Sequence, residues 1–376
     1  MLYLDNAATT PVRREVLEAM APYLTGEFGN PSSRHTYGER AAAALEQARE
    51  RIAPLLGMRR RDIVFTSGGT EANNLAVKGI AIAAQQTRGS RHVIVSAIEH
   101  ESVLASADYL QRVHGFEMTR LPVDGAGRVD PSELAGAIRD DTALVSIALA
   151  NNEIGTVQDI AALRRAAEHV PLHTDAVQAA GWLPLDDLGV DALTVAGHKL
   201  GAPKGTGLLA VRGRVPIEPL VHGGGQERGR RSGTESVAGA VALATAMELA
   251  EAERVANAAR VAALRDELVE RVLAEVPSAR LTGHPRERLP GTASFTFEGT
   301  SGEAVLLELE RRGIVCSSGS ACAAGSSDPS HVLLAVGVPA EVALTGVRLS
   351  LSQTHREGLG PVAEAIAASV AAVRGL

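Results

Sequence analysis

Two residues of this sequence have surroundings that would let them act as nucleophiles, a lysine among glycines and a cysteine among small polar residues. Lys199 follows the apolar run Ala192–Val195 and precedes a glycine-rich stretch that ends at Gly207. A lysine held close to the backbone after a buried strand is desolvated, so its pKa falls and its neutral amine can form a Schiff base with a carbonyl. The alternative, a surface lysine in a glycine-rich turn, suits Lys204 better than Lys199.

Cys322 lies in the segment Ser317–His331, where most neighbours are small, polar or glycine. Such a segment has little to pack, so we expect a mobile loop with an exposed thiol that can act as a nucleophile once it is a thiolate. The alternative is an incidental surface cysteine. The only other cysteine, Cys316, is expected to end a strand as a small buried hydrophobe. Two cysteines provide no disulfide framework and make a poor zinc site.

Two strand ends offer polar groups for a ligand. Ser67-Gly68-Gly69-Thr70 lies between an apolar run and a helical pattern, where glycines let the backbone approach an anion and a helix start presents free N–H groups. Any strand-to-helix turn favours such residues, so this signal alone is weak. Asp175 follows another apolar run, and its carboxylate could pair with a protonated pyridine nitrogen. Asp175 could equally be a helix N-cap.

Alternating apolar runs and helical patterns must position these groups. The runs lack polar alternation, which favours a parallel sheet covered on both faces. Strands are predicted at 62–66, 92–96, 144–148, 172–175, 192–195 and 291–297, and helices at 38–56, 101–114, 236–276, 302–312 and 360–373. This order is typical of an α/β protein.

We therefore predict a large domain, 14–256, with a mostly parallel sheet flanked by helices. A smaller α+β domain, 1–13 and 257–376, would carry the cysteine segment. The helix at 236–276 would bridge the two, with the change of domain near 254–257. A chain of 376 residues is too long for one ordinary core, which supports two domains.

Composition excludes several classes of function. The net charge of −7 and the 3% aromatic content argue against direct nucleic-acid binding. No run of about 18 apolar residues predicts a membrane span, and the first residues lack the pattern of a signal peptide. We therefore expect a cytoplasmic protein.

Several motifs in one order resemble the cysteine desulfurases, which belong to the aminotransferase-like pyridoxal-phosphate superfamily (fold type I, aspartate-aminotransferase-like). The resemblance covers the chain from about residue 3 to its last helix. It is carried by Asn6–Pro11, Asn30–Ser33, Thr66–Glu71, Asn151–Gly155, Asp175–Gln178, Gly197–Lys199 and Ser318–Cys322.

The resemblance implies pyridoxal 5'-phosphate as cofactor and L-cysteine as substrate. Lys199 would be the Schiff-base lysine and Cys322 the thiol that takes the sulfur as a persulfide, which leaves L-alanine. His100 would stack on the cofactor ring and shuttle protons. Arg348 would bind the substrate carboxylate, with Asn152 as a second substrate-binding residue; a surface salt bridge is the alternative for Arg348. The other implied contacts are Asp175 to the ring nitrogen, Gln178 and Asn152 (rather than Asn151) near the phenolic oxygen, and Gly69, Thr70 and His198 at the phosphate.

The resemblance also implies partners. Thr234 would reach the phosphate of a partner subunit, which makes the protein an obligate homodimer. The Cys322 segment resembles the long-loop group, which passes sulfur directly to an iron–sulfur scaffold protein or a tRNA-thiolation enzyme. No intrinsic metal is expected, although Cys322 is a candidate shared iron–sulfur ligand with a scaffold partner.

One position departs from the family pattern. Family members often have a serine two residues before the His-Lys pair, and here that residue is Ala196. A hydroxyl bonded to an ionised phosphate contributes roughly 1.5–3 kcal/mol, so we expect weaker cofactor binding. Two other functions remain open on the sequence alone: a selenocysteine lyase or aminotransferase on the same fold, and a non-catalytic protein that has kept the fold.

Overall fold

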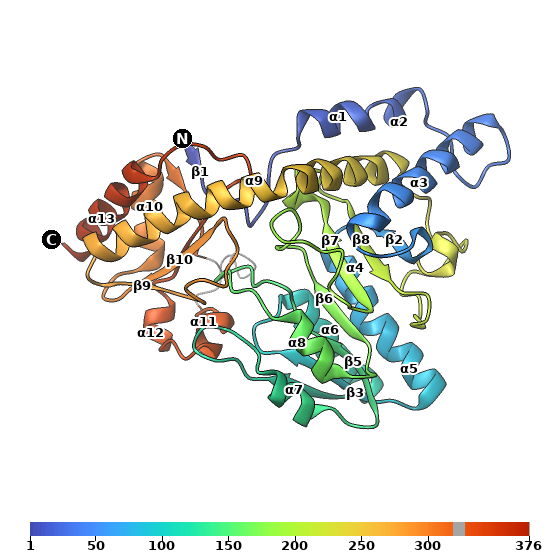
Figure 1. The fold of residues 1–376 in the computed structure, drawn as a ribbon, viewed down its shortest axis with the longest axis horizontal. Coiled ribbons are helices and arrows are strands. Elements are labelled where there is room, and N and C mark those ends of the chain that lie inside the picture. Colours follow the sequence, from blue (N-terminus) through green and yellow to red (C-terminus); the bar gives the residue numbers. More distant parts are fainter. Residues whose placement is uncertain (319–327, 376) are drawn as a thin grey trace.

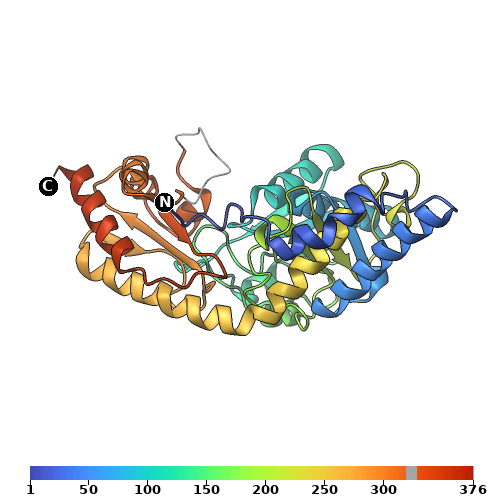
Figure 2. The ribbon, with the colours of Figure 1, turned by 90° about the horizontal axis from the view of Figure 1, so that it is seen from above.

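The computed structural model describes residues 1–318 and 328–375, which form two lobes joined by one long helix (Figures 1 and 2). That helix, α9 (Val237–Glu275), has 39 residues and runs along both lobes. Its first half is buried against the large sheet, whereas Val261, Leu268 and Val272 of its second half pack into the core of the small lobe. The helix predicted at 236–276 is therefore present.

The large lobe is built on a sheet that has seven strands within the described ranges, in the order β2-β8-β7-β6-β5-β3-β4. All neighbours in it are parallel except β8, which is antiparallel to both β2 and β7. The strands are β2 (Ile63–Thr66), β3 (His92–Ser96), β4 (Glu117–Leu121), β5 (Thr142–Ser146), β6 (Leu172–Asp175), β7 (Ala192–Ala196) and β8 (Gly207–Val211).

Helices cover both faces of this sheet because successive strand residues point to opposite sides. Ile63 packs into the core beneath α3 (Thr36–Leu55) and α9, whereas Val64 packs into the core beneath α5 (Ile80–Arg88) and α6 (Glu101–His114). The remaining helices of this lobe are α1 (Arg14–Met20), α2 (Pro22–Thr25), α4 (Gly69–Asn74), α7 (Pro131–Ala137) and α8 (Ile160–Ala167), and its short helical segments are η1 (Arg60–Asp62), η2 (Leu75–Gly79), η3 (Gly197–Lys199) and η4 (Glu227–Gly229).

The small lobe contains an antiparallel sheet of order β12-β10-β9 and a parallel pair, β1 with β11. Both ends of the described chain lie in this lobe (Figure 1). Its elements are β1 (Leu2–Tyr3), β9 (Ala279–Leu281), β10 (Thr292–Phe297), β11 (Ile314–Val315), β12 (Val347–Ser350), α10 (Gly302–Arg311), α11 (His331–Ala335), α12 (Ala340–Ala343) and α13 (Gly360–Arg374). We propose to keep the division into 14–256 and 1–13 with 257–376, since each part has its own main apolar core. Leu289 packs into the core of the first part, and a small cluster that includes Ile98 and Val332 joins the two.

One predicted strand was misplaced. The run 144–148 was expected to be extended throughout, but β5 spans Thr142–Ser146. The backbone N–H of Ala148 donates to the carboxyl group of Glu99, 3.0 Å from each oxygen, so it serves the site and not the sheet. The strands β1, β4, β8, β9 and β12 were not predicted. Within the described ranges, no helix combines the length and the apolar character that a bilayer crossing requires.

Candidate active site

A cavity of about 440 Å³ opens at the carboxyl ends of the parallel strands, where open α/β sheets usually bind ligands. It brings together residues from β6, β7, the start of α4, and β12 of the small lobe. Nine of the eleven predicted site residues line it: Gly69, Thr70, His100, Asn152, Asp175, Gln178, His198, Lys199 and Arg348.

Lys199 ends η3, directly after β7, and its amine is directed at the N-terminal segment. Its Nζ donates to the carbonyl oxygens of Ala7 and Ala8, the latter at 2.7 Å. The side-chain amide of Gln178 donates to the same Ala7 oxygen at 3.0 Å. The segment after β1 therefore holds Lys199 and Gln178 at one place on the cavity wall.

A chain of side chains connects the carboxylate of Asp175 with the ring of His100. Asn73 Nδ2 donates to Asp175 Oδ2 at 2.6 Å and to Ser102 Oγ at 2.9 Å. Ser102 Oγ lies 2.8 Å from His100 Nδ1, and Val177 N donates to Asp175 Oδ1 at 2.9 Å. Asn73 and Ser102 were not predicted. They orient the carboxylate and the ring toward one cavity although β6 and α6 are far apart in sequence.

The same contacts determine which nitrogen of His100 carries the proton. The backbone N–H of Ser102 donates to Nδ1 at 3.1 Å, so Nδ1 is an acceptor. A neutral His100 therefore carries its proton on Nε2. A neutral His100 could accept a proton at Nε2 only as the other tautomer, with its own proton on Nδ1. That tautomer would lose the hydrogen bond from the Ser102 backbone N–H.

The turn from Ser67 to Thr70, here called the glycine cradle, contains two residues without side chains, Gly68 and Gly69. Gly68 has φ of 152°, a conformation that favours glycine, and a Cβ on Gly207 would lie 2.6 Å from Gly68 Cα. A Cβ on Gly69 would lie 2.9 Å from a methyl carbon of Val177. The first turn of α4 leaves backbone N–H groups without helical partners, as an anion site requires.

His198 adds a neutral donor beside this turn. Its Nδ1 lies 3.2 Å from Thr9 Oγ1. Burial, together with the charges of Lys199 and Lys204, lowers the pKa of His198 to about 4. The imidazole is therefore neutral at pH 7 and offers a single N–H. Ala196, which has no hydroxyl group, also lines the cavity.

Arg348 reaches the cavity from β12, and its guanidinium group is buried. Its Nη2 pairs with Asp5 Oδ1 at 2.7 Å, and its Nη1 donates to the carbonyl oxygen of Asn152 at 2.7 Å. The alternative of a surface salt bridge is therefore wrong. Asn151 differs from Asn152, because its side chain caps the local turn by accepting from Glu153 N and Ile154 N.

Cys322 lies outside the described residues, but both flanks of its segment attach near the cavity. Ser317 pairs with Arg348 through two backbone hydrogen bonds of 2.6 and 3.2 Å. On the other side, Ser330 Oγ donates to the carboxylate of Glu153, and His331 Nε2 lies 3.0 Å from the carbonyl oxygen of Glu99.

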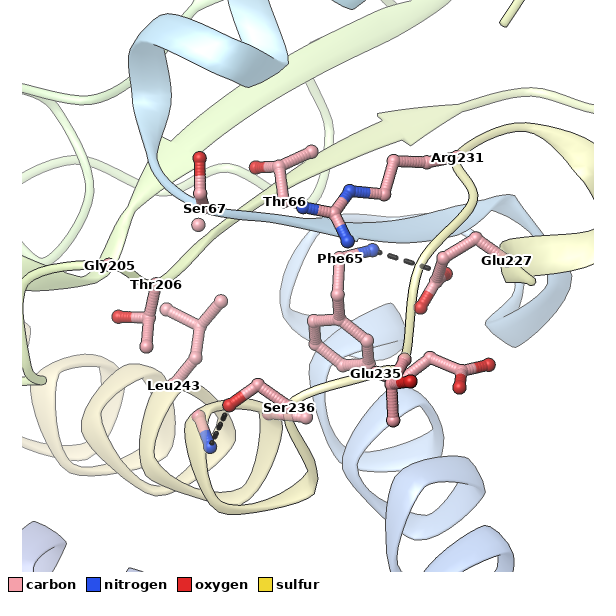
Figure 3. A pocket seen from close by; sticks show the side chains of 14 residues that line it. Phe65, Thr66, Ser67, Gly205, Thr206, Glu227, Arg231, Glu235, Ser236 and Leu243 are labelled. Carbon is pink, nitrogen blue, oxygen red and sulfur yellow. Dashed lines mark hydrogen bonds between the residues drawn. The ribbon is translucent and has the colours of Figure 1, made fainter. Parts of the chain in front are cut away.

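Thr234 lies apart from these groups. It lines a neighbouring cavity of about 140 Å³ together with Ser67, Thr206 and Arg231 (Figure 3). Its predicted contact with the phosphate of a partner subunit stays a prediction.

Comparison with known proteins identifies the family. The model of the class V aminotransferases matches residues 2–357. The chain is 48% identical to the cysteine desulfurase IscS of Methanosarcina thermophila over 358 residues, which are 94% of this chain and 88% of that protein. An IscS-like cysteine desulfurase of Mycobacterium tuberculosis is 47% identical over 365 residues, 95% of this chain and 93% of the relative. The chain belongs to the cysteine desulfurases of the class V aminotransferase family.

Solved structures of cysteine desulfurase relatives and similar proteins support the same fold. A NifS-like protein superposes with a TM-score of 0.88 at 36% identity, over 100% of this chain and 98% of that one. SspA, in complex with cysteine, has a TM-score of 0.81 at 38% identity, over 93% of this chain and 99% of the other. The predicted α/β class, with a mostly parallel sheet and a smaller lobe, is confirmed.

The site of this family member fits the cofactor of class V aminotransferases, pyridoxal 5'-phosphate. The cavity has the size of a typical small-molecule site. A Cβ on Gly69 would clash with Val177, so the turn can pack this closely only with glycine there, and the start of α4 offers backbone donors for a phosphate. The carboxylate of Asp175 and the amine of Lys199 line the same space, as a pyridine nitrogen and an aldehyde require.

Cys316 of this cysteine desulfurase is unsuited to sulfur chemistry. It follows β11 and packs against the apolar core of the small lobe. Burial, with the nearby charge of Asp5, raises the pKa of its thiol to about 12, although Arg348 acts in the opposite direction. The thiol is therefore protonated at neutral pH, which agrees with the predicted role of Cys316 as a small hydrophobe.

Glu99, which was not predicted, is the buried carboxyl group next to His100. Ser96 Oγ and the Ala148 N–H donate to it. Burial raises its pKa to about 8; the hydrogen bonds oppose this, and the charge of Asp175 adds to it. Glu99 is therefore largely protonated at pH 7 in the folded protein.

This protonation predicts a pH-dependent stability. At a pH above the ordinary pKa of a glutamate, Glu99 is ionised in the unfolded chain but still protonated in the folded protein. Unfolding therefore releases a proton, and the free energy of unfolding falls as the pH rises toward 8. The histidines with lowered pKa act in the opposite sense, but only below about pH 6.5. Between about pH 6.5 and 8, the free energy of unfolding of the cofactor-free protein should fall by up to about 1.4 kcal/mol per pH unit.

Urea unfolding at several pH values measures this slope. A Glu99→Gln protein, which has no titrating group there, should show a flatter dependence over the same range. Glu101→Gln, a change at an exposed neighbour, should keep the wild-type slope. An equal slope in the Glu99→Gln protein would show that Glu99 is ionised in the fold.

Proposed function

We propose that this chain is a pyridoxal-phosphate enzyme that converts L-cysteine to L-alanine and passes the sulfur to Cys322. The names of its relatives support this activity, since two cysteine desulfurases match it over 88% and 93% of their own length. Cysteine is the molecule in the complex with SspA. The supporting observation in this chain is that Lys199, Asp175 and Arg348 line one cavity, to whose rim both flanks of the Cys322 segment attach.

Four groups would hold the cofactor. The glycine turn and His198 would bind its phosphate, Asp175 would pair with its ring nitrogen, and Lys199 would hold its aldehyde carbon. The bound cofactor supplies an electron sink that stabilises negative charge at the substrate α-carbon. Asp175 maintains that sink by keeping the ring nitrogen protonated, and Asn73 and Val177 keep its carboxylate in place.

Lys199 and His100 are the two groups that we assign to proton transfer. With cofactor and substrate bound, the amine of Lys199 would act as the base at the substrate α-carbon, since Lys199 lines the cavity that would hold both. His100 would stack on the ring, with Nδ1 fixed by Ser102. We therefore assign the α-proton to Lys199, and assign His100 to orientation and to donation from Nε2.

Arg348 would bind the substrate carboxylate. Its buried guanidinium lines the cavity and is held by Asp5 and by the carbonyl oxygen of Asn152, and a guanidinium suits two-point binding of a carboxylate. These contacts fix the plane of the group, so a carboxylate entering the cavity meets an oriented donor. They also keep the guanidinium near charge balance before substrate binds.

The sulfur step balances without an added oxidant. The Cys322 thiolate attacks the sulfur of the bound substrate, an S–S bond forms, and the C–S bond breaks. The electron pair of that bond remains on the substrate carbon, which takes up a proton and leaves as alanine. Cysteine and a thiol thus become alanine and a persulfide, and the persulfide sulfur is passed to an acceptor.

We also propose that the protein is a homodimer, in which Thr234 reaches the partner's phosphate site, and that it is cytoplasmic. The acceptor would be an iron–sulfur scaffold protein or a tRNA-thiolation enzyme, reached by the long Cys322 segment. No direct contact with nucleic acid is expected, given the net charge of −7.

Incubation with L-cysteine and a reductant tests the activity. One alanine and one sulfide should form for each cysteine consumed. A keto acid in place of alanine would indicate an aminotransferase, and turnover of selenocysteine alone would indicate a selenocysteine lyase. A protein that neither binds pyridoxal phosphate nor consumes cysteine would contradict the proposal.

Ala196 provides a prediction about affinity. An Ala196→Ser protein places a hydroxyl on the cavity wall near the phosphate cradle. One hydrogen bond to an ionised phosphate should tighten binding of pyridoxal phosphate by about tenfold or more. Absorbance titration of cofactor-free protein measures this, with Ala196→Cys as the control, since it adds one atom at the same place but only a weak donor. Equal affinity in the Ser variant and the wild type would show that another donor already occupies this place.

A further inference from the structure

The turn that would bind the phosphate is closed by a side chain of its own helix. Glu71 Oε2 accepts from the backbone N–H of Ser67 at 2.8 Å, so the carboxylate at the start of α4 reaches back to the end of β2. Thr66 Oγ1 donates to the carbonyl oxygen of Gly68 at 3.0 Å. The backbone between these contacts contains Gly68 and Gly69, which have no side chains to hold it. Its geometry therefore depends on Glu71.

Arg231, 160 residues later, holds this carboxylate in place. Its Nε donates to Glu71 Oε1 at 2.8 Å, and its Nη2 donates to Oε2 at 3.3 Å. Both side chains are largely shielded from solvent, at 24% and 20% exposure, so solvent screens the pair less than a surface ion pair. Burial alone would raise the pKa of Glu71, but the bonds from Arg231 and Ser67 lower it below its ordinary value.

The loop around η4 that carries Arg231 is itself anchored. Glu227 pairs with Arg49 of α3 at 2.7 Å, with both side chains buried, and its other oxygen accepts from Phe65 N of β2 at 3.2 Å. The Arg49 guanidinium also lies 5.1 Å from the centre of the Phe65 ring. Glu227 and Arg228 have φ of 50° and 58°, which is costly for residues other than glycine. These anchoring contacts offset that strain.

The loop thus contacts the strand and the helix on either side of the phosphate turn. Glu227 binds Phe65 on the open edge of β2, and Arg231 binds Glu71 in the first turn of α4. In Figure 3, Arg231 and Glu227 extend from the loop that passes beside β2, and Ser67 lies just beyond Thr66, the last residue of that strand. Since neither residue lines the cofactor cavity, each would act through the backbone of the turn.

We propose that Arg231 is a positioning residue for the cofactor phosphate, acting through Glu71 to fix the backbone donors of the turn from Ser67 to Thr70. This rests on the proposed function, because it requires that the turn binds a phosphate. The loop also carries Thr234, so the arrangement ties the turn of each chain to the segment that would reach the partner's site.

A purely structural ion pair is the competing explanation, and the chain contains a matched control. Arg51 makes a two-point contact with Glu248 in the same lobe, at 2.9 and 2.6 Å, although this pair is more exposed, at 35% and 41%. That pair connects α3 with α9 and contacts no residue of the turn. Arg51→Gln therefore removes a comparable interaction from the fold without affecting the phosphate turn.

The test compares pyridoxal phosphate with pyridoxal, which has the same ring and aldehyde but lacks the phosphate. Cofactor-free wild type, Arg231→Gln and Arg51→Gln are titrated with each compound, and binding is followed by absorbance. Arg231→Gln should weaken binding of pyridoxal phosphate by about tenfold, and of pyridoxal by less than about twofold, because one charge-assisted contact has this magnitude. Arg51→Gln should leave both affinities near wild type.

Two further variants and a second measurement separate a positioning role of Arg231 from a structural one. Glu71→Gln should reproduce the selective loss, and Arg231→Lys, which keeps the charge but not the two-point contact, should recover only part of it. The cofactor-induced rise in melting temperature should shrink in Arg231→Gln but not in Arg51→Gln. Equal losses for both compounds, or no loss, would overturn the positioning role. A wild type that binds pyridoxal but gains nothing from the phosphate would instead refute the proposed phosphate site.

Discussion

A Lys199→Ala protein is expected to form alanine from L-cysteine at least about a thousandfold more slowly than wild type, because it loses both the amine that holds the cofactor and the base at the α-carbon. Its folding should change little. The Lys199 amine contacts carbonyl oxygens of Ala7 and Ala8, which water can reach once the side chain is removed.

Chromatographic measurement of alanine gives the rate, and borohydride reduction shows the attachment. Wild-type protein treated with pyridoxal phosphate and borohydride should carry the label on the peptide that contains Lys199. Lys204→Ala is the matched control, since Lys204 is exposed and follows in the same glycine-rich stretch. It should keep roughly the wild-type rate and the label. Alanine formation by Lys199→Ala at a rate near wild type would refute the assignment.

A Cys322→Ser protein is expected to form no persulfide and to lose at least about a hundredfold in sulfide release, because a serine hydroxyl is not ionised at neutral pH and cannot take the sulfur. Cofactor binding should be unchanged, since neither the cradle nor Lys199 is altered. The absorbance of the bound cofactor, measured beside the sulfide assay, separates these two effects.

Cys316→Ala is the control for the second thiol. With a pKa of about 12, raised mainly by burial, the Cys316 thiol should contribute nothing to sulfur transfer. The variant should therefore retain the wild-type sulfide rate, and it leaves Cys322 as the only cysteine of the chain. Loss of sulfur transfer in Cys316→Ala, with retention in Cys322→Ser, would reverse the roles assigned to the two thiols.

The sequence was informative about groups that lie at strand ends, because their positions follow from local patterns. Lys199, Asp175 and the glycine turn each follow an apolar run, and the carboxyl ends of β7, β6 and β2 place them around one cavity. The helix at Glu101–His114 was predicted with its observed bounds, since Gly115 ends it. A local stop signal of this kind needs no knowledge of the tertiary structure.

Residues that orient the site could not be predicted in this way. Asn73 bonds Asp175 across 102 positions, and Arg231 bonds Glu71 across 160. Nothing in a helical pattern or a loop indicates such a partner, because the contact exists only after the sheet brings both elements together. The strand predicted at 144–148 was misplaced for the same reason. The N–H of Ala148 donates to Glu99, a contact between residues far apart in sequence that no local pattern indicates.

Mass spectrometry after a single turnover tests the central claim most directly. Protein loaded with pyridoxal phosphate is mixed with one equivalent of L-cysteine, alkylated and digested. The peptide that contains Cys322 should gain one sulfur atom in step with one alanine per chain, in wild type and in Cys316→Ala, and should gain none in Lys199→Ala. Alanine formed while Cys322 gains no sulfur would contradict the account.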